Sequence, residues 1–309
     1  MFFDWRDAMK RELVIRTADI GGTQCRRADI RGGNLEKYLA TGSVNSPDEL
    51  VDFVCGDLPV NCMGVAISVA GIVENGIVVQ SPNISMLNEV NLAYRIERKS
   101  RLSAKVYNDM DGGAAGMFAL LSNQGIKVRR SLCMTWSTGI GARVVDNGTI
   151  VNPGAEMSHF VIDKDPSAPK CGCELRGCVE SLIGGISIKE MVIEITKPFI
   201  PAGTHPCTFL DQEFDSGKDW AFEVYFHAAK FMAQFLAVVM TTAVFQDVIY
   251  KGTFGMSAFS RISLLIKQYM KESLMVGMRG RVDGMRFIPS PDPENDALHG
   301  SAALFLKDS

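Results

Sequence analysis

The stretch LVIRTADIGGT, residues Leu13 to Thr23, is an apolar run that ends in two glycines and a threonine. Its first eight residues predict a buried strand, and Gly21-Gly22-Thr23 predicts a sharp turn. Cys25 to Ile30 then predicts a returning strand. The same order recurs later in the chain, with a strand at 131–136, a polar turn at 137–141, and strands at 142–145 and 149–151. This degenerate repeat predicts an α/β protein with two strand-rich lobes.

Local signals predict the other elements. Ser46 is a candidate N-cap, Pro47 suits a first helical turn, and Glu49 completes a capping box. Asn75-Gly76 predicts a tight hairpin turn, and Asp146-Asn147-Gly148 predicts another. We also expect strands at 63–69 and 104–107, a hairpin at 73–79, and helices at 112–121, 219–245, 258–272 and 296–307.

Composition is ordinary for a soluble globular protein. Of 309 residues, 47% are apolar and 22% charged, and the net charge is -3, so neither a nucleic-acid nor a membrane partner is expected. The charged segment MFFDWRDAMKREL does not resemble a signal peptide. The apolar run from Phe231 to Phe245 is too short to span a membrane and predicts a buried core helix. Scattered cysteines fit a reducing, cytoplasmic location.

Two glycine-bearing turns are candidate phosphate loops. In the first, Asp19 precedes Gly21, Gly22 and Thr23, whose backbone N–H groups and hydroxyl suit a phosphate, while the carboxylate suits Mg²⁺. In the second, Thr138, Gly139 and Gly141 offer the same chemistry. Plain β-turns are the alternative for each loop. Their recurrence in a repeated unit favours a nucleotide phosphate chain, although the chain has neither a Walker motif nor a G-x-G-x-x-G motif.

Asn108-Asp109 lies where a strand meets a helix rich in small residues. A carboxylate at this position can accept the proton of a substrate hydroxyl and so make its oxygen a better nucleophile toward a phosphoryl group. The alternative is a helix cap, because Asn and Asp are favoured N-caps.

The sequence CGCELRGCVE, Cys171 to Glu180, holds three of the eight cysteines. Cys171, Cys173 and Cys178 follow His159, and three thiolates with one imidazole make a tetrahedral zinc set. A disulfide between Cys171 and Cys173 would be awkward across one residue. Free cysteines in a turn are the alternative.

Two acids flank these cysteines. Glu156 lies three residues before His159, and Glu180 lies two after Cys178. If a metal holds both segments together, the two carboxylates converge beside an imidazole, which suits a polyhydroxylated ligand. The alternative is a pair of surface acids without a role.

Together these residues resemble the ROK family of sugar kinases, which includes bacterial glucokinases and N-acetylmannosamine kinases. The resemblance spans most of the chain. It rests on the two phosphate loops, the stretch SVAGIVENGIVVQSPNI (Ser68 to Ile84), the Asn108-Asp109 pair, the segment Glu156 to His159, and the C-x-C-x4-C-x-E motif that ends at Glu180.

The resemblance implies an actin-like, ribonuclease H-like ATPase fold of two lobes with a central cleft. We expect residues 1–107, joined by the helix 296–309, to form the smaller lobe, and residues 108–295 to form the larger, zinc-binding lobe. The implied activity is ATP-dependent phosphorylation of a hexose or N-acylhexosamine, as in a glucokinase or an N-acetylhexosamine kinase, with structural Zn²⁺ and with Mg²⁺ bound to ATP. The family also implies a homodimer.

The family's residue roles carry over by position. Asp109 is the implied general base. The implied sugar-binding residues are Gly71, Asn83, Asn108, Asp109, Glu156, His159 and Glu180. The implied nucleotide-binding residues are Asp19, Gly21, Gly22, Thr23, Thr138, Gly139 and Gly141, and the implied metal ligands are His159, Cys171, Cys173 and Cys178.

Some positions depart from the family pattern. Ser137 and Ser158 stand where glycine is usual, Ala142-Arg143 follows the second loop, and Tyr250 to Gly255 replaces a glycine-rich stretch near the adenosine. These departures leave open a non-catalytic, sugar-binding member. A DNA-binding repressor, the other branch of the family, is disfavoured because only about a dozen residues precede the first strand.

Overall fold

The computed structural model describes residues 13–197 and 199–309, and what the sequence predicts for the segment before Leu13 lies outside this part. The described residues form two compact units. The first comprises residues 13–129, 145–154 and 290–309, and the second comprises residues 130–144 and 155–289. Each unit is an α/β arrangement around a sheet, and each is described separately below.

The first unit is built on a sheet with strand order β3-β2-β1-β4-β8. The first three strands are antiparallel neighbours, whereas β4 and β8 run parallel to β1. Its elements are β1 (Val14–Ile20), β2 (Gln24–Arg31), β3 (Asn34–Gly42), α2 (Pro47–Cys55), β4 (Cys62–Val69), β5 (Ile72–Glu74), β6 (Ile77–Gln80), η1 (Ser85–Leu87), β7 (Val90–Asn91), α3 (Leu92–Ser100), β8 (Ser103–Asn108), α4 (Asp109–Asn123), β11 (Thr149–Ile150) and α11 (Asp296–Asp308).

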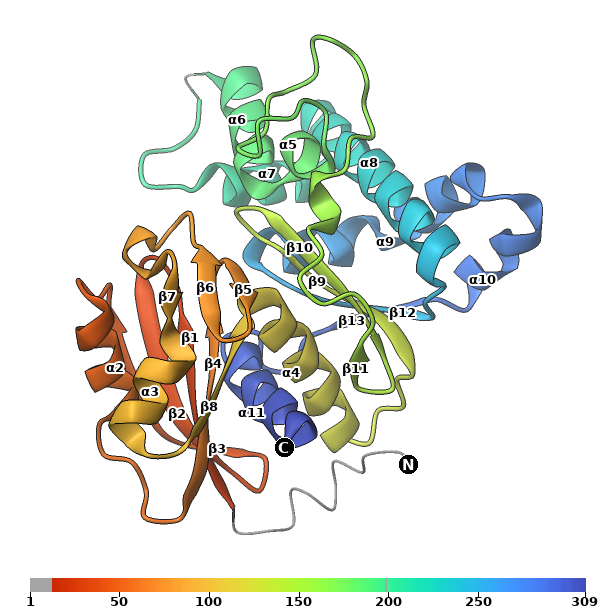
Figure 1. The fold of residues 1–309 in the computed structure, drawn as a ribbon. Helices are drawn as coiled ribbons and strands as arrows, with labels where there is room; N and C mark the ends of the chain where they lie inside the picture. The colour runs from red at the N-terminus through yellow and green to blue at the C-terminus, as the bar shows by residue number, and fades with distance from the viewer. Residues whose placement is uncertain (1–12, 198) are drawn as a thin grey trace. The chain divides into compact units, whose positions relative to one another are not determined.

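Two helix pairs cover the two faces of this sheet. Helices α2 and α3 lie on one face and α4 and α11 on the other (Figure 1). Side chains of β4 point alternately to the two faces. Val65 and Ile67 pack on the side of α2 and α3, while Ala66 packs with Phe305 of α11. The period-two alternation of a strand therefore supplies both faces with apolar side chains.

Helices α4 and α11 approach each other backbone to backbone. A Cβ at Gly116 would lie 1.8 Å from the carbonyl oxygen of Asp296, and one at Gly300 would lie 1.7 Å from that of Gly112. Only glycine fits at Gly116 and Gly300. The small residues of α4 therefore serve to hold this helix against α11, and they fix the position of its first residue, Asp109.

The second unit repeats the strand plan of the first. Its strands have the order β10-β9-β12-β13, so that β9, β10, β12 and β13 take the places of β1, β2, β4 and β8. Its elements are β9 (Arg130–Trp136), β10 (Ile140–Asp146), η2 (Met157–His159), α5 (Val179–Ile183), α6 (Gly185–Thr196), α7 (Pro206–Asp215), α8 (Asp219–Ala243), β12 (Asp247–Lys251), α9 (Thr253–Ser273), η3 (Val276–Met278), α10 (Arg279–Asp283) and β13 (Arg286–Pro289). The predicted repeat is confirmed by this order.

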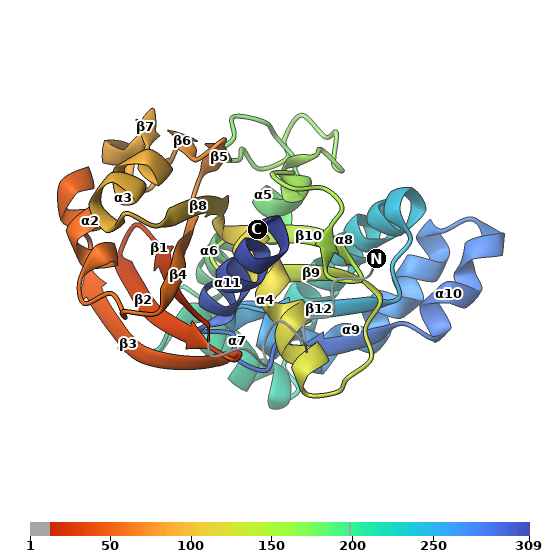
Figure 2. The ribbon, with the colours of Figure 1, turned by 60° about the horizontal axis from the view of Figure 1, so that its bottom comes forward.

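Helix α8 is the central core helix of the second unit, beside α9 (Figure 2). By length and composition alone it is apolar enough to cross a membrane. Its apolar side chains, among them Tyr225, Phe235 and Leu236, are instead buried in the core of the unit. The prediction of a buried core helix is confirmed, with the helix ending at Ala243.

The predicted turns and cap are also present. Ser46 Oγ accepts the Glu49 N–H at 3.2 Å, while the Glu49 carboxylate accepts the N–H of Asn45, one residue earlier than in a full capping box. Asn75 and Gly76 both have positive φ, as do Asn147 and Gly148. Those values are typical of the tight hairpin turns that Asn-Gly predicts.

The division between units differs from the expected boundary after residue 107. Helix α4 belongs to the first unit together with α11 and the segment 145–154. The reason is the α4–α11 packing, which depends on residues almost 190 positions apart in the sequence and leaves no local signal.

Candidate functional site

The predicted sugar-side residues of the first unit meet at one edge of its sheet. In the parallel register, Ile20 of β1 pairs with Val69 of β4, and Val69 pairs with Asn108 of β8. The first phosphate loop, Gly71 and Asp109 follow these strand ends directly. Carboxyl ends of parallel strands are the usual place for ligands in α/β folds.

Asp19, the acid before the first loop, is held by two side chains. Ser68 Oγ donates to its Oδ1 at 3.0 Å, and Arg26 pairs with its Oδ2 through Nη2. Arg26 also donates to the carbonyl of Glu294. Neither Ser68 nor Arg26 was assigned a role from the sequence, although Arg26 follows the loop by only three residues.

The first loop packs directly on Asn83. A Cβ at Gly22 would lie 2.9 Å from the Asn83 Cβ, so this position requires a glycine. Gly21, Gly22 and Asn83 share a shallow pocket of about 250 Å³. The structure thus brings together one predicted nucleotide-binding segment and one predicted sugar-binding residue.

Asn108 and Asp109 have different positions at the start of α4. Asn108 is the N-cap: its Oδ1 accepts the N–H groups of Met110 and Asp111, and its Nδ2 donates to the Gly71 carbonyl at 2.8 Å. Asp109 is exposed, and its Oδ1 accepts the Met110 N–H at 2.9 Å. Because Asn108 performs the capping, the carboxylate of Asp109 is not required for it.

The four predicted metal ligands converge in the second unit. The ligand atoms of His159, Cys171, Cys173 and Cys178 all lie within 4.8 Å of one another. His159 Nδ1 lies 3.6 Å from the Cys171 sulfur and 4.0 Å from the Cys178 sulfur. Tetrahedral zinc with ordinary bond lengths separates a sulfur and a nitrogen ligand by roughly 3.6 Å, so this donor set fits zinc.

The electrostatics of the cluster favour a thiolate at Cys178, whereas burial raises the pKa of Cys171. Burial opposes ionisation of Cys178, but hydrogen bonds from Ser181, His159 and Cys171 together lower its pKa to about 7. A deprotonated sulfur is the form that binds a metal.

Glu180 connects this cluster to the second loop. Its Oε1 lies 3.9 Å from His159 Nε2, the ring nitrogen that faces away from the sulfurs, and its Oε2 accepts the Ile140 N–H at 2.9 Å. A Cβ at Gly139 would lie 2.3 Å from the same oxygen. The carboxylate therefore lies against the loop backbone, which only a glycine permits.

Helix α6 holds the other side of the second loop. Gly185 N–H donates to the Ser137 carbonyl at 2.9 Å, and Ile186 N–H donates to the Thr138 carbonyl at 3.1 Å. Gly141, the last residue of the predicted loop, is the second residue of β10. The loop is thus fixed from both sides before any ligand binds.

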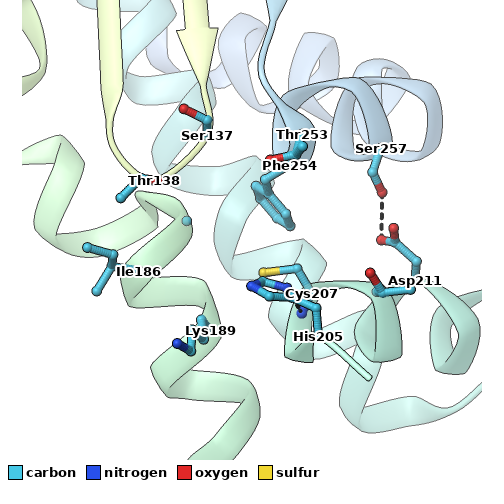
Figure 3. A pocket seen from close by; sticks show the side chains of 12 residues that line it. Ser137, Thr138, Ile186, Lys189, His205, Cys207, Asp211, Thr253, Phe254 and Ser257 are labelled. Carbon is cyan, nitrogen blue, oxygen red and sulfur yellow. Dashed lines mark hydrogen bonds between the residues drawn. The ribbon is translucent and has the colours of Figure 1, made fainter. Parts of the chain in front are cut away.

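A pocket of about 420 Å³ extends from this loop within the second unit (Figure 3). Its walls come from the loop, α6, α7 and the start of α9. The lining includes Thr138, Lys189, Cys207, Asp211, Phe254 and Ser257. Sequence reasoning assigned only Thr138 and the altered glycine stretch to this region, since isolated polar residues on helices carry no motif.

Glu156 and Arg143, two positions considered in the sequence, also lie in this unit. Glu156 is exposed at the start of η2, and its carbonyl accepts the His159 N–H at 3.1 Å, so it lies beside the cluster in the chain. Arg143, a departure from the family pattern, is 1% exposed and donates to the carbonyls of Ala142 and Ala155. It does not line the pocket, because its guanidinium is committed to the backbone.

Comparison with known proteins identifies the family of the chain. The model of the ROK family matches residues 44–308. An N-acetylmannosamine kinase of Citrobacter koseri is 27% identical over 77% of this chain and 83% of its own length. The N-acetylmannosamine kinase of Vibrio vulnificus strain CMCP6 is 32% identical over 57% of this chain and 63% of its own length.

Solved structures show the same fold. A ROK hexokinase from Thermus thermophilus matches with a TM-score of 0.76 at 19% identity, over 96% of this chain and all of the other. A ROK glucokinase from Streptomyces griseus, in complex with glucose and AMPPNP, matches with a TM-score of 0.70 at 18% identity, over 94% and 98%. The expected actin-like ATPase fold is confirmed.

Proposed function

Since the chain belongs to the ROK family, whose model covers most of it, we propose that this sugar kinase phosphorylates an N-acylhexosamine, with ATP as donor and Asp109 as general base. The N-acetylmannosamine kinases among its relatives favour this substrate class over glucose. The observation that carries the proposal is the exposed carboxylate of Asp109 beside a separately capped helix start.

Asp109 would take the proton of the reacting sugar hydroxyl. The hydroxyl oxygen then attacks the γ-phosphorus of ATP, and the bond from that phosphorus to the bridging oxygen breaks to release ADP. A carboxylate at the first residue of a fifteen-residue helix is also stabilised as an anion by the helix dipole.

Each unit has its own residues that are proposed to bind sugar hydroxyls. On the first unit these are Asn83, Asn108 and the backbone at Gly71, which the Asn108 amide already fixes. On the second unit they are Glu156, Glu180 and His159 Nε2, which faces away from the thiols. Carboxylates and amides are suited to hydroxyl and acetamido groups because they accept or donate hydrogen bonds at fixed positions.

Zinc would be bound by His159, Cys171, Cys173 and Cys178 as a structural ion. With four protein ligands such a site is closed, so the metal would orient His159 and Glu180 rather than contact the reacting atoms. The phosphates and Mg²⁺ would be held by the loops Asp19 to Thr23 and Thr138 to Gly141. The non-catalytic alternative is not favoured, because the named relatives are kinases.

The test is a coupled ADP-release assay over glucose, mannose, N-acetylglucosamine and N-acetylmannosamine with MgATP. We expect kcat/KM to be at least tenfold higher for an N-acetylhexosamine than for its parent hexose. A preference for glucose would overturn the substrate class but not the kinase assignment. Gel filtration of the same sample tests the proposed homodimer.

A further inference from the structure

The far end of the 420 Å³ pocket holds a cluster of hydrogen-bonded side chains on three helices. Ser257 Oγ of α9 donates to Asp211 Oδ1 of α7 at 2.6 Å, and the Tyr225 hydroxyl of α8 donates to the same oxygen. Arg261 Nη1 donates to Ser257 Oγ at 2.9 Å. Ser257 and Tyr225 therefore donate to the same carboxylate oxygen, Oδ1, and neither donates to Oδ2.

Asp211 Oδ2 receives no hydrogen bond within the described part of the chain, and the Asp211 side chain is 24% exposed. Arg261 binds both oxygens of Asp215 through Nε and Nη2, at 3.0 and 2.6 Å, and its Nη1 forms a longer ion pair of 3.9 Å with Asp211 Oδ1. The pocket therefore has one carboxylate oxygen to which no described residue donates a hydrogen bond. An acceptor left in this state favours a ligand that brings a donor.

The position of Asp211 suits the base of a nucleotide. Figure 3 shows the Asp211–Ser257 pair on one side of the pocket, Thr138 and Ile186 on the other, and the Phe254 ring between them. Phosphates bound at the Thr138 loop would place the base toward Asp211, with an apolar ring beside it. Apolar walls with a few fixed polar groups are the usual composition of such pockets.

We propose that Asp211 determines the donor specificity of this enzyme, with Oδ2 accepting a hydrogen bond from the exocyclic amine of adenine. This inference rests on the proposed function, in which the donor is a nucleotide. Adenine presents an amine at position 6, whereas guanine and hypoxanthine present an oxygen there. A 6-oxo group would face the carboxylate with lone pair against lone pair, so it would be rejected.

Because Tyr225 and Ser257 both donate to Oδ1, the Asp211 carboxylate can bind a base through Oδ2 alone. Guanine has two adjacent donors, at N1 and N2, which would bind a carboxylate best through both oxygens. Oδ1 already accepts from Tyr225 and Ser257, so only Oδ2 remains. In the variant Asp211→Asn the same two hydroxyls would fix the orientation of the side-chain amide. Its oxygen would accept from Tyr225 and Ser257, and its NH₂ would face the pocket.

The test compares nucleotides on the full-length protein with saturating sugar. For the wild type we expect kcat/KM for ATP to exceed that for ITP, and that for purine riboside triphosphate, by about tenfold or more. The kcat/KM for deoxy-ATP should lie within about threefold of that for ATP, because the proposed contact is with the base and not with the ribose. Equal use of ATP and purine riboside triphosphate by the wild type would overturn the proposal without any variant.

Asp211→Asn gives the sharper result. Because the amide NH₂ donates to a 6-oxo group, the ratio of ITP to ATP use should rise at least tenfold. Tyr225→Phe is the matched control, since it removes one partner of Oδ1 and should leave the ratio unchanged. If Asp211 only joins α7 to α8 and α9, both variants will lower the melting temperature without moving the ratio, and that result overturns the proposal.

Calorimetry separates this proposal from the kinase assignment. Binding of ATP, ITP and purine riboside triphosphate is measured without sugar. A chain that binds ATP at least tenfold more tightly than ITP but transfers no phosphate supports the role of Asp211 and contradicts the proposed function. A chain that binds none of the three nucleotides contradicts the role of Asp211.

Discussion

Arg26 and Asp19 form an ion pair at the end of β1, immediately before the first phosphate loop. Their side chains are only 23% and 13% exposed, so the pair is largely shielded from water. The acid proposed to hold Mg²⁺ is thus paired with an arginine. A metal ion bound by Asp19 would compete with Arg26 for the same carboxylate.

Arg26→Ala should therefore make the stability of the protein depend on Mg²⁺. Loss of the guanidinium leaves a partly buried carboxylate without its main cation, which costs about 1–3 kcal/mol of unfolding free energy. Adding millimolar Mg²⁺ should restore more stability to the variant than it gives the wild type. Thermal unfolding with and without Mg²⁺ measures this. Arg31→Ala is the control, since the Arg31–Glu36 pair is surface-exposed and distant from the loop. An equal Mg²⁺ response in all three proteins would contradict the competition.

Asp109→Asn should abolish phosphoryl transfer and leave the fold intact. Removal of a general base lowers turnover about 10²- to 10⁴-fold. The helix start survives because Asn108 caps it, so the melting temperature should change little. Coupled turnover, sugar binding by calorimetry and thermal unfolding are the measurements. Asn108→Ala, in contrast, should lower the free energy of unfolding by about 1 kcal/mol, because it removes the helix cap. Full turnover in Asp109→Asn would exclude the general-base role.

Purified protein should contain about one zinc per chain, and Cys173→Ser should lose it. Three remaining ligands bind zinc more weakly, and the loss should destabilise the segment between His159 and Glu180. Elemental analysis and thermal unfolding with a chelator measure both effects. Cys55→Ser is the matched control, because Cys55 is a free cysteine that is not one of the four proposed ligands. Metal-free protein that folds normally would contradict the zinc assignment.

Glu180 variants should separate sugar binding from loop support. Glu180→Gln keeps an acceptor for the Ile140 N–H but loses the charge beside His159. We expect its KM for sugar to rise about tenfold with the KM for ATP nearly unchanged. Glu180→Ala loses both contacts and should raise both constants. Steady-state kinetics measure the KM for sugar and the KM for ATP of each variant. If both constants change equally in the two variants, the contact with the Ile140 N–H is unimportant.

Acid should destabilise the protein partly through His227 and His299. Burial lowers the pKa of both imidazoles, opposed at His227 by the Leu182 carbonyl and at His299 by Asp292. Below about pH 6.5 the unfolded chain binds protons that the folded chain does not, so stability falls as the pH falls, by at most about 1.4 kcal/mol per unit for each histidine. Denaturant unfolding between pH 5 and 8, with His227→Gln for comparison, measures this. An unchanged slope in the variant would contradict the assignment.

Local patterns predicted much of this molecule. The strand-turn order at 13–30 and 131–151, the Asn-Gly turns and the cysteine spacing each depend on neighbours in the sequence, and the structure contains all of them. The roles of the predicted site residues in catalysis and binding stay predictions. What the structure adds is their grouping, such as Asn108 with Gly71 and Gly22 with Asn83.

Other features depend on packing between distant segments and were not predictable. Asp211 and Ser257 lie 46 positions apart on two helices whose polar residues look like ordinary exposed positions. Arg143 follows the second loop in the sequence, which suggested a place near the nucleotide. In the structure it is buried and donates to the Ala155 carbonyl. The limit of the first unit depended in the same way on the contact between Gly116 and Asp296.

That last contact has a consequence for how the chain is made. The helix that carries Asp109 is seated against α11, so the core of the first unit contains residues from both ends of the described chain. During synthesis, α4 leaves the ribosome long before α11 exists, and the whole second unit is translated in between. The Asp109 carboxylate therefore reaches its final place late, after the second unit has had time to fold, and until then the apolar face of the first sheet needs protection from aggregation.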